Sequence, residues 1–227
     1  KICGPRALAV LPKLMKPLLS FLVAASNFIE SSTNEEDDID KKELSQAKLM
    51  QLAIMRTFRS IVERMPMLLQ PYLVGILTTF GKVSGSFLRD SLNQTHSIQT
   101  EMVSLQKIMT SNIPTRQLIP AASKSIFSTP NVELNLSNLS IMIESITNSK
   151  SSDVSGMISL VIKTATHVFD QDSMEEGSSA VMQAADKLLL CLVMKLSEVQ
   201  LRSLYRKLRE WRGDLDQSDP EQTAARR

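Results

Sequence analysis

The stretch MPMLLQP at residues 65–71 closes one apolar helical pattern and opens another. Proline disrupts a helix interior but suits the first helical turn, where its missing N–H group costs nothing. The first proline therefore marks a turn, and the second lies early in the following helix. The same arrangement of two prolines is found in LPKLMKP at 11–17 and in IPTRQLIP at 113–120. These stretches predict helices that are joined by short turns.

The turns recur at intervals of about 40 to 55 residues, close to the period of HEAT and armadillo repeats. Two later turns, at 149–153 and 197–198, use polar residues in place of proline. A single helical hairpin cannot bury its own apolar face, so several hairpins stack to share a core. The pattern predicts an all-α chain, an α-solenoid of HEAT-type helical hairpins. The alternative is an ordinary helical bundle with prolines at its turns.

The composition also favours helices packed on helices. Hydrophobic residues make up 43% of the 227 residues and aromatic residues only 4%, so aliphatic side chains must form the core. β-Sandwiches use more aromatic and β-branched residues than this. The seven glycines are too few for a fold with many tight hairpins.

Apolar spacings of three and four residues predict where the helices begin and end. We expect a new helix to begin near Pro17. Asp153 and Ser197 are expected to be N-caps, because their side-chain oxygens can accept the free amides of a first helical turn. The expected helices cover 17–29, 42–64, 68–83, 95–111, 115–127, 131–147, 153–169, 178–196 and 197–212.

These elements divide the chain into four parts. A partial HEAT-type hairpin over 1–30 precedes an acidic polar loop over 31–42, which we read as a solvated loop more than as a docking site for a basic partner. A HEAT-type repeat array of about four helix pairs follows over 43–212. Residues 213–227 form a polar tail or the start of a truncated further repeat. Because the sequence begins inside an apolar helical pattern and not at Met, we expect it to be a piece of a longer protein.

Charge and cysteine content limit the possible functions. The net charge is +2, so any basic surface must be local and the whole chain does not require a nucleic-acid partner. No apolar run reaches the roughly 18 residues of a membrane span. Cys3 and Cys191 fit neither a metal spacing nor a disulfide framework, which favours a reducing compartment.

The sequence contains no recognisable catalytic, cofactor or metal site. His96 and His167 lack further ligands at metal spacing, so each is expected to be a surface or packing residue. The segments 84–86 and 177–179 lack the context of a phosphate-binding loop. We therefore expect no enzyme, no cofactor and no small-molecule substrate. The alternative, a helical enzyme domain, would need a polar pocket of converging titratable groups.

The last expected helix carries the candidate binding surface. Its apolar stripe comprises Leu201, Leu204, Tyr205, Leu208 and Trp211. Arginines one helical turn apart on the remaining surface can meet successive phosphates or a carboxylate-rich partner. The alternative is that they supply only solubility and helix propensity. The candidate contact patch comprises Arg202, Arg206, Lys207, Arg209 and Arg212.

Several ordered segments resemble a known family. KLSE at 195–198, followed by a helix that closes on YRKLREW at 205–211, is similar to the C-terminal region of the large HEAT-repeat protein of the small-subunit processome. VERMP at 62–66, IPTRQLIPA at 113–121 and DV at 153–154 agree with this region in order and spacing. Most of the chain from 5 to 212 therefore resembles the family of the tenth U-three small nucleolar RNA-associated protein, called HEAT repeat-containing protein one in animals.

The resemblance implies a nucleolar scaffold of ribosome biogenesis without catalytic or cofactor residues. The family acts in the early subcomplex on the 5′ external transcribed spacer, in pre-rRNA processing and in support of rRNA transcription. It implies processome proteins as the main partners, with pre-rRNA or small nucleolar RNA as a further partner. The family continues into more helices after the position of Trp211, whereas this sequence turns polar there. The alternative is a HEAT-repeat protein-binding adaptor of another class, such as a transport or phosphatase scaffold.

Overall fold

The computed structural model describes residues 4–34, 41–89, 96–129, 131–171 and 178–213. These residues form ten α-helices and one 3-10 helix, with no strand among them, so the all-α class is confirmed. The helices are α1 (Gly4–Asn34), α2 (Lys41–Arg64), η1 (Pro66–Tyr72), α3 (Leu73–Arg89), α4 (His96–Asn112), α5 (Thr115–Ser128), α6 (Val132–Asn148), α7 (Ser151–Ser155), α8 (Ile158–Gln171), α9 (Ser178–Val193) and α10 (Glu198–Gly213).

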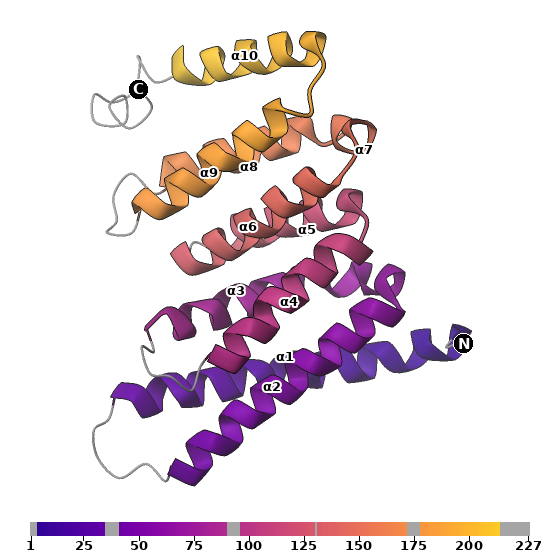
Figure 1. Ribbon diagram of the computed structural model, residues 1–227, viewed down its shortest axis with the longest axis vertical. Helices are drawn as coiled ribbons and strands as arrows, with labels where there is room; N and C mark the ends of the chain where they lie inside the picture. The colour runs from indigo at the N-terminus through magenta and orange to yellow at the C-terminus, as the bar shows by residue number, and fades with distance from the viewer. Residues whose placement is uncertain (1–3, 35–40, 90–95, 130, 172–177, 214–227) are drawn as a thin grey trace.

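The long helices lie in two rows, between which the chain alternates (Figure 1). In the A row, α1 contacts α3, α3 contacts α5 and α5 contacts α8; in the B row, α2, α4, α6 and α9 contact one another in the same order. The helix α10 extends the A row, because the Trp211 ring lies 6.0 Å from the Phe169 ring of α8. Each row therefore repeats one packing step from end to end.

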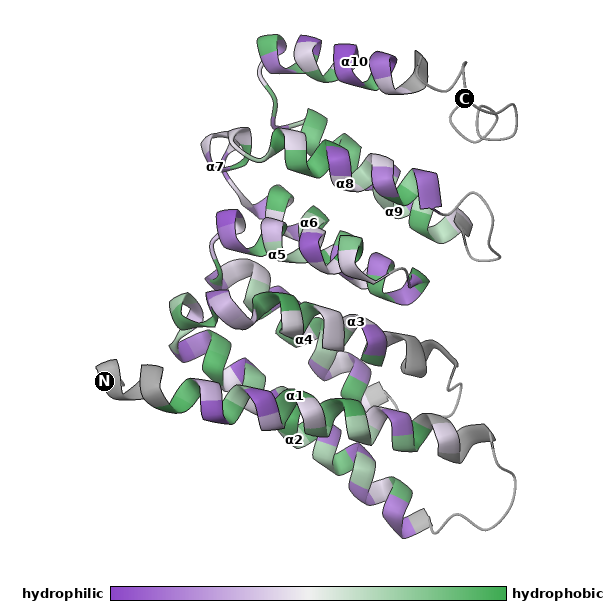
Figure 2. Ribbon diagram, turned by 180° about the vertical axis from the view of Figure 1, so that it is seen from behind, coloured by the Kyte–Doolittle hydropathy of each residue, from purple (hydrophilic) through white to green (hydrophobic). Residues whose placement is uncertain are grey.

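One hydrophobic core fills the space between the rows. It runs from Leu11 in α1 to Leu204 in α10. Phe58 of α2 and Phe80 of α3 meet edge to face, with ring centroids 5.4 Å apart. Such an aromatic pair contributes roughly 0.5–1.5 kcal/mol beyond the burial of its area. Figure 2 shows how apolar and polar residues alternate along the helices on the A-row side.

The helix α1 is continuous, so the expectation of a new helix near Pro17 is wrong. Both Pro12 and Pro17 lie inside it and are exposed. Leu11, Met15 and Leu22 remain buried on one face across both prolines. Burial of such a side chain contributes about 1.5–3 kcal/mol, whereas a proline inside a helix costs about 3 kcal/mol. The shared buried face therefore maintains one helix where the local sequence predicts two.

The first connection is also shorter than the acidic loop expected over 31–42. The helix α1 extends to Asn34 and α2 begins at Lys41, so residues at both ends of that range are helical. The acidic run 35–38 lies outside the described residues.

Two other expected helices differ from the structure at their ends. The helix expected over 68–83 begins as the 3-10 helix η1 and becomes the α-helix α3 only at Leu73, because Pro71 has no N–H to donate within an α-helical ladder. The proposed N-cap role of Asp153 is wrong. Asp153 lies inside α7, which Lys150 precedes and Gly156 ends, so α8 begins only at Ile158.

The cap predicted at Ser197 is confirmed. Its backbone N–H donates to Gln200 Oε1 at 3.0 Å, while the Gln200 N–H points to Ser197 Oγ at 3.5 Å. This reciprocal arrangement is a capping box, which satisfies two amides that the first helical turn leaves free. The helices expected over 42–64, 95–111, 115–127 and 131–147 agree with α2, α4, α5 and α6 to within one residue at each end.

Buried hydroxyl and amide groups connect the helices. Ser125 of α5 is fully buried and contacts Thr78 Oγ1 of α3 at 2.8 Å, and it accepts from Asn138 Nδ2 of α6 at 3.1 Å. Thr164 of α8 donates to Ser123 of α5 at 2.9 Å. These bonds satisfy groups that would otherwise be costly to bury, and they link three neighbours to α5. Apolar periodicity gave no indication of them.

Candidate interaction surfaces

The predicted contact patch lies on α10, which packs on the end of the A row. Leu204 is buried, and Leu208 packs against the core beside Trp211. The capping box at Ser197 fixes the start of the helix. The opposite side of α10 is therefore held in place facing away from the core.

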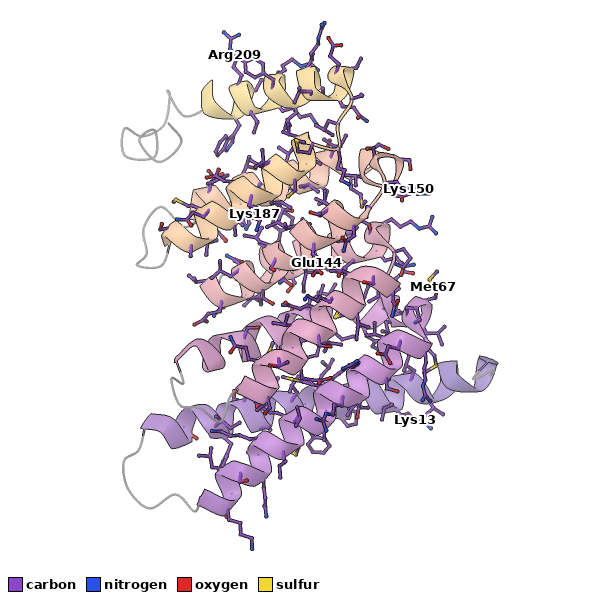
Figure 3. All side chains as sticks on the ribbon, in the orientation of Figure 1. Lys13, Met67, Glu144, Lys150, Lys187 and Arg209 are labelled. Carbon is purple, nitrogen blue, oxygen red and sulfur yellow. The ribbon has the colours of Figure 1, made fainter. Side chains whose placement is uncertain are left out.

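The structure brings together three of the predicted patch residues. Arg202, Arg206 and Arg209 are exposed and lie at i, i+4 and i+7, so they share one stripe. Figure 3 shows Arg209 on the outer side of α10. Lys207 lies on another side, where its Nζ donates to Ser159 Oγ of α8 at 2.7 Å. The side chain of Arg212 lies outside the described residues.

Two of the arginines already have acidic neighbours on the same helix. Arg202 Nη2 lies 2.6 Å from Glu198 Oε1, and Arg206 Nε lies 3.9 Å from Glu210 Oε1. Exposed pairs of this kind contribute only about 0.2–1 kcal/mol. An incoming phosphate or carboxylate can therefore replace these partners at small cost, and the three arginines stay available.

The apolar stripe predicted on α10 is only partly buried. Leu201 is 41% exposed and Tyr205 is 68% exposed. Leu190 and Met194, near the end of α9, are exposed as well. The reason is positional, because no described B-row helix follows α9 to cover this flank. The C-terminal end of the described array thus presents an apolar edge, which consists of Leu190, Met194, Leu201 and Tyr205.

A second apolar surface lies on α1. Val10, Leu14 and Phe21 recur at spacings of four and seven residues, and all three are exposed. At 3.6 residues per turn they lie about 100° around the helix from Met15 and Leu22, which face the core. The helix α1 is therefore apolar on two sides. The sequence-based predictions did not include this surface.

No family model matches this chain. Comparison with curated protein sequences gives no match either.

The near-neutral net charge conceals an uneven distribution. The described residues carry 23 basic and 11 acidic side chains, a formal charge of +12. The segments outside them carry 13 acidic and 3 basic residues, which brings the whole chain to +2. The helical framework is therefore strongly basic, and most of the acidic residues lie in the sequence between and after the helices.

The charge also differs between the two rows. On α3, α5 and α8 of the A row, the described charged side chains are four basic residues and one acidic residue. On α4, α6 and α9 of the B row, they are two basic and four acidic residues. Figure 3 labels Glu144 and Lys187 on the B-row helices. Positive potential is therefore concentrated on the A-row side.

A polar groove of about 930 Å³ lies between the turn that joins α4 to α5 and the turn that joins α6 to α7. Arg116 and Lys150 supply its positive charge, and Asp153 supplies a negative charge. The hydroxyls of Thr115 and Ser149 form a hydrogen bond there. The groove therefore presents side chains of both charges and hydroxyl groups at the turns between these helices.

The histidine and cysteine side chains have packing roles where they are described. The His167 ring lies 4.8 Å from the Phe127 ring, edge to face, as a packing residue should. Cys191 is a free thiol that accepts a hydrogen bond from Thr147 Oγ1 at 3.7 Å. His96 has its side chain outside the described residues. Within the described part of the chain, no three His, Cys, Asp or Glu side chains lie close enough to hold a metal ion.

One charged cluster on the B row links two helices. Arg59 Nε of α2 donates to Glu63 Oε1 at 3.1 Å, and its Nη1 donates to Glu101 Oε1 of α4 at 3.4 Å. Both bonds raise the pKa of Arg59 above its ordinary value, and the bond to Glu63 has the larger effect. Arg59 therefore remains charged throughout the pH range of the folded protein, and its role is structural.

None of the helices in the described residues combines the length and the apolar character that crossing a bilayer requires.

Proposed function

We propose that the chain is a segment of an α-solenoid of HEAT-type hairpins and a non-catalytic scaffold of ribosome biogenesis. The observation that carries the fold is the repeated step between hairpins. α1–α2, α5–α6 and α8–α9 pack as hairpins, α3 packs mainly on α6, and these helices follow one another in two rows over one core that α10 extends. A repeated step with nearest-neighbour contacts is the property that distinguishes a solenoid from a closed bundle.

The assignment to ribosome biogenesis is supported by the resemblance of the segments at 62–73, 113–121 and 195–211 to the processome family. In this role the protein acts in the nucleolus, within the small-subunit processome, in pre-rRNA processing and in support of rRNA transcription. It does so by holding partners in fixed relative positions. An elongated array offers many separate contacts for this purpose.

Two kinds of surface support this mechanism. The apolar edge at the end of α9 and α10 suits protein partners, because buried aromatic and aliphatic side chains dominate protein–protein affinity. The stripe Arg202, Arg206 and Arg209 suits an anionic partner, either RNA phosphates or carboxylates. We propose processome proteins as the main partners, with pre-rRNA or small nucleolar RNA as a further partner at the stripe.

The proposed function is tested by affinity purification of the full-length protein from its own cells, with mass spectrometry and sequencing of bound RNA. We expect early processome proteins together with 5′ spacer pre-rRNA. Recovery of transport receptors or phosphatase subunits in their place would leave the repeat architecture standing. It would overturn the role in ribosome biogenesis and favour an adaptor of that class.

The role of the α10 stripe is tested by the triple variant R202E/R206E/R209E. Binding to RNA or to an acidic partner should weaken while the thermal unfolding midpoint changes little, because all three side chains are exposed. The control variant R56E/K107E/K187E makes the same change of charge at exposed positions of the B row. If the α10 variant retains all partners, the stripe is not a contact surface.

A further inference from the structure

Three neighbouring A-row helices present a surface of one chemical character. We define the A face as the exposed sides of α3, α5 and α8. Its basic residues are Lys82, Arg116, Lys124 and Lys163, all of them exposed, and its one described acidic residue is Asp170. Among the described side chains of these three helices, none of the large hydrophobic residues is exposed.

The basic side chains of the A face are not used to stabilise the fold by ion pairing. None of the four forms a salt bridge with another described residue, in contrast to Arg59 on the B row. Lys163 Nζ lies 5.5 Å from the centroid of the Phe127 ring, a cation–π contact that leaves the ammonium group exposed. Four cations thus lie on three adjacent helices whose described side chains include one carboxylate, Asp170, and one of the four, Arg116, also lines the polar groove that contains Asp153.

The chemistry of this face selects its partner. Protein interfaces are centred on apolar and aromatic anchors and are depleted in lysine, whereas the A face lacks such anchors and has three lysines among its four cations. Lysine binds phosphate as a point charge and requires no particular geometry. We propose that the A face binds the phosphate backbone of a nucleic acid, without reading its bases.

The dimensions of the face agree with this partner. Packed helices lie about 8–10 Å apart, so the axes of α3 and α8 are separated by about 20 Å. Phosphates of one strand in a double helix follow at about 3.4 Å along the axis. The A face therefore spans roughly six phosphates. It is separate from the α10 stripe, and backbone binding here would remain if the role in ribosome biogenesis failed.

The test is binding of the 227-residue chain to a labelled, unstructured single-stranded RNA about 20 nucleotides long, measured by fluorescence anisotropy over a range of salt concentrations. Four phosphate contacts on a single strand predict a slope of log K against log salt of about −3. The variant K82E/K124E/K163E should bind about tenfold more weakly or worse, with a slope shallower by about 2.

The matched control is R56E/K107E/K187E, which lowers the net charge by the same amount on the B row. It should bind within about twofold of the parent protein if the A face is the site. Far-UV circular dichroism and the thermal midpoint establish that both variants are folded. If charge reversal unfolds the A-face variant, K82Q/K124Q/K163Q replaces it, and the same comparison applies.

Three outcomes would overturn the proposal. Equal losses in the two variants would show an effect of total charge and not of the A face. Unchanged binding in the A-face variant would place the site elsewhere. Poly-glutamate that competes as well as RNA at equal charge would identify the face as a docking surface for acidic proteins.

Discussion

At the scale of single residues, the closest approach between helices is at Gly81. A Cβ atom added there would lie 2.8 Å from both Cα and Cγ of Leu134, so α3 and α6 meet through the missing side chain. Contacts this short require a backbone shift, since Cα of Leu134 cannot rotate away. Gly81 therefore fixes how closely the A row packs on the B row.

The substitution Gly81→Ala should destabilise the protein. Overpacking costs about 1–3 kcal/mol, which exceeds the gain of about 1 kcal/mol in helix propensity. Gly75→Ala is the control, because its Cβ would meet only Leu19 Cδ1 at 3.5 Å, an ordinary contact. Gly75→Ala should raise the unfolding free energy by about 0.4–1 kcal/mol. Urea unfolding monitored by circular dichroism measures both, and equal effects would refute the close approach.

A second prediction concerns the buried hydroxyl at Ser125. Ser125→Ala removes the acceptor of Asn138 Nδ2 and leaves that fully buried amide without its bond. We expect a loss of about 1–3 kcal/mol, the cost of an unsatisfied buried polar group. Ser128→Ala deletes a hydroxyl of the same helix that is exposed, and it should change stability by less than about 0.5 kcal/mol. Indistinguishable midpoints for the two variants would show that the buried bond contributes nothing net.

At the scale of whole elements, α1 tolerates two internal prolines because its buried face continues past them. Pro17→Ala restores a helical N–H at an exposed position, so it should stabilise the protein by up to about 3 kcal/mol. Hydrogen exchange should slow within α1 in particular. If exchange there does not change, the carbonyls before Pro17 already have equivalent partners, and the assigned cost is wrong.

How far the elements follow from the sequence depends on which interactions set each boundary. The ends of α2, α4, α5 and α6 were predicted closely, because a local turn and an apolar stripe change at the same place. The continuity of α1 was missed, because its determinant is burial against α2 and α3, which local proline rules do not contain. The early break at Gly156 was missed for a related reason, since Asp153 is a good cap that lies inside α7.

The same distinction, between features set by local sequence and features set by tertiary packing, applies to the candidate surfaces. The arginine stripe of α10 could be predicted, because its three members lie within eight residues and share helical spacing. The A face could not, because Lys82, Arg116 and Lys163 are far apart in sequence and only the packing of α3, α5 and α8 places them on one side. Net charge was misleading here, since acidic residues outside the described helices mask a basic framework.

At the scale of the whole molecule, each helix contacts mainly its neighbours. We therefore expect a destabilising substitution to affect only the helices near it. Leu22→Ala in α1 and Leu139→Ala in α6 each remove a fully buried side chain, with an expected cost of about 2–5 kcal/mol. In a repeat array, Leu22→Ala should accelerate hydrogen exchange in α1 and α2 and leave α8 and α9 protected. Leu139→Ala should affect both sides of α6. Uniform loss of protection in both variants would indicate one cooperative bundle and contradict the proposed solenoid.

The positive charge of α3, α5 and α8 and the negative charge of α4, α6 and α9 also give this part of the helical framework an electric dipole moment across its thin dimension. A molecule with such a moment rotates in the field of a distant charged body before any atoms touch. Near a polyanion, it would approach with α3, α5 and α8 leading and with α4, α6 and α9 turned away. The B-row surface would then remain accessible to a second partner at the moment of first encounter.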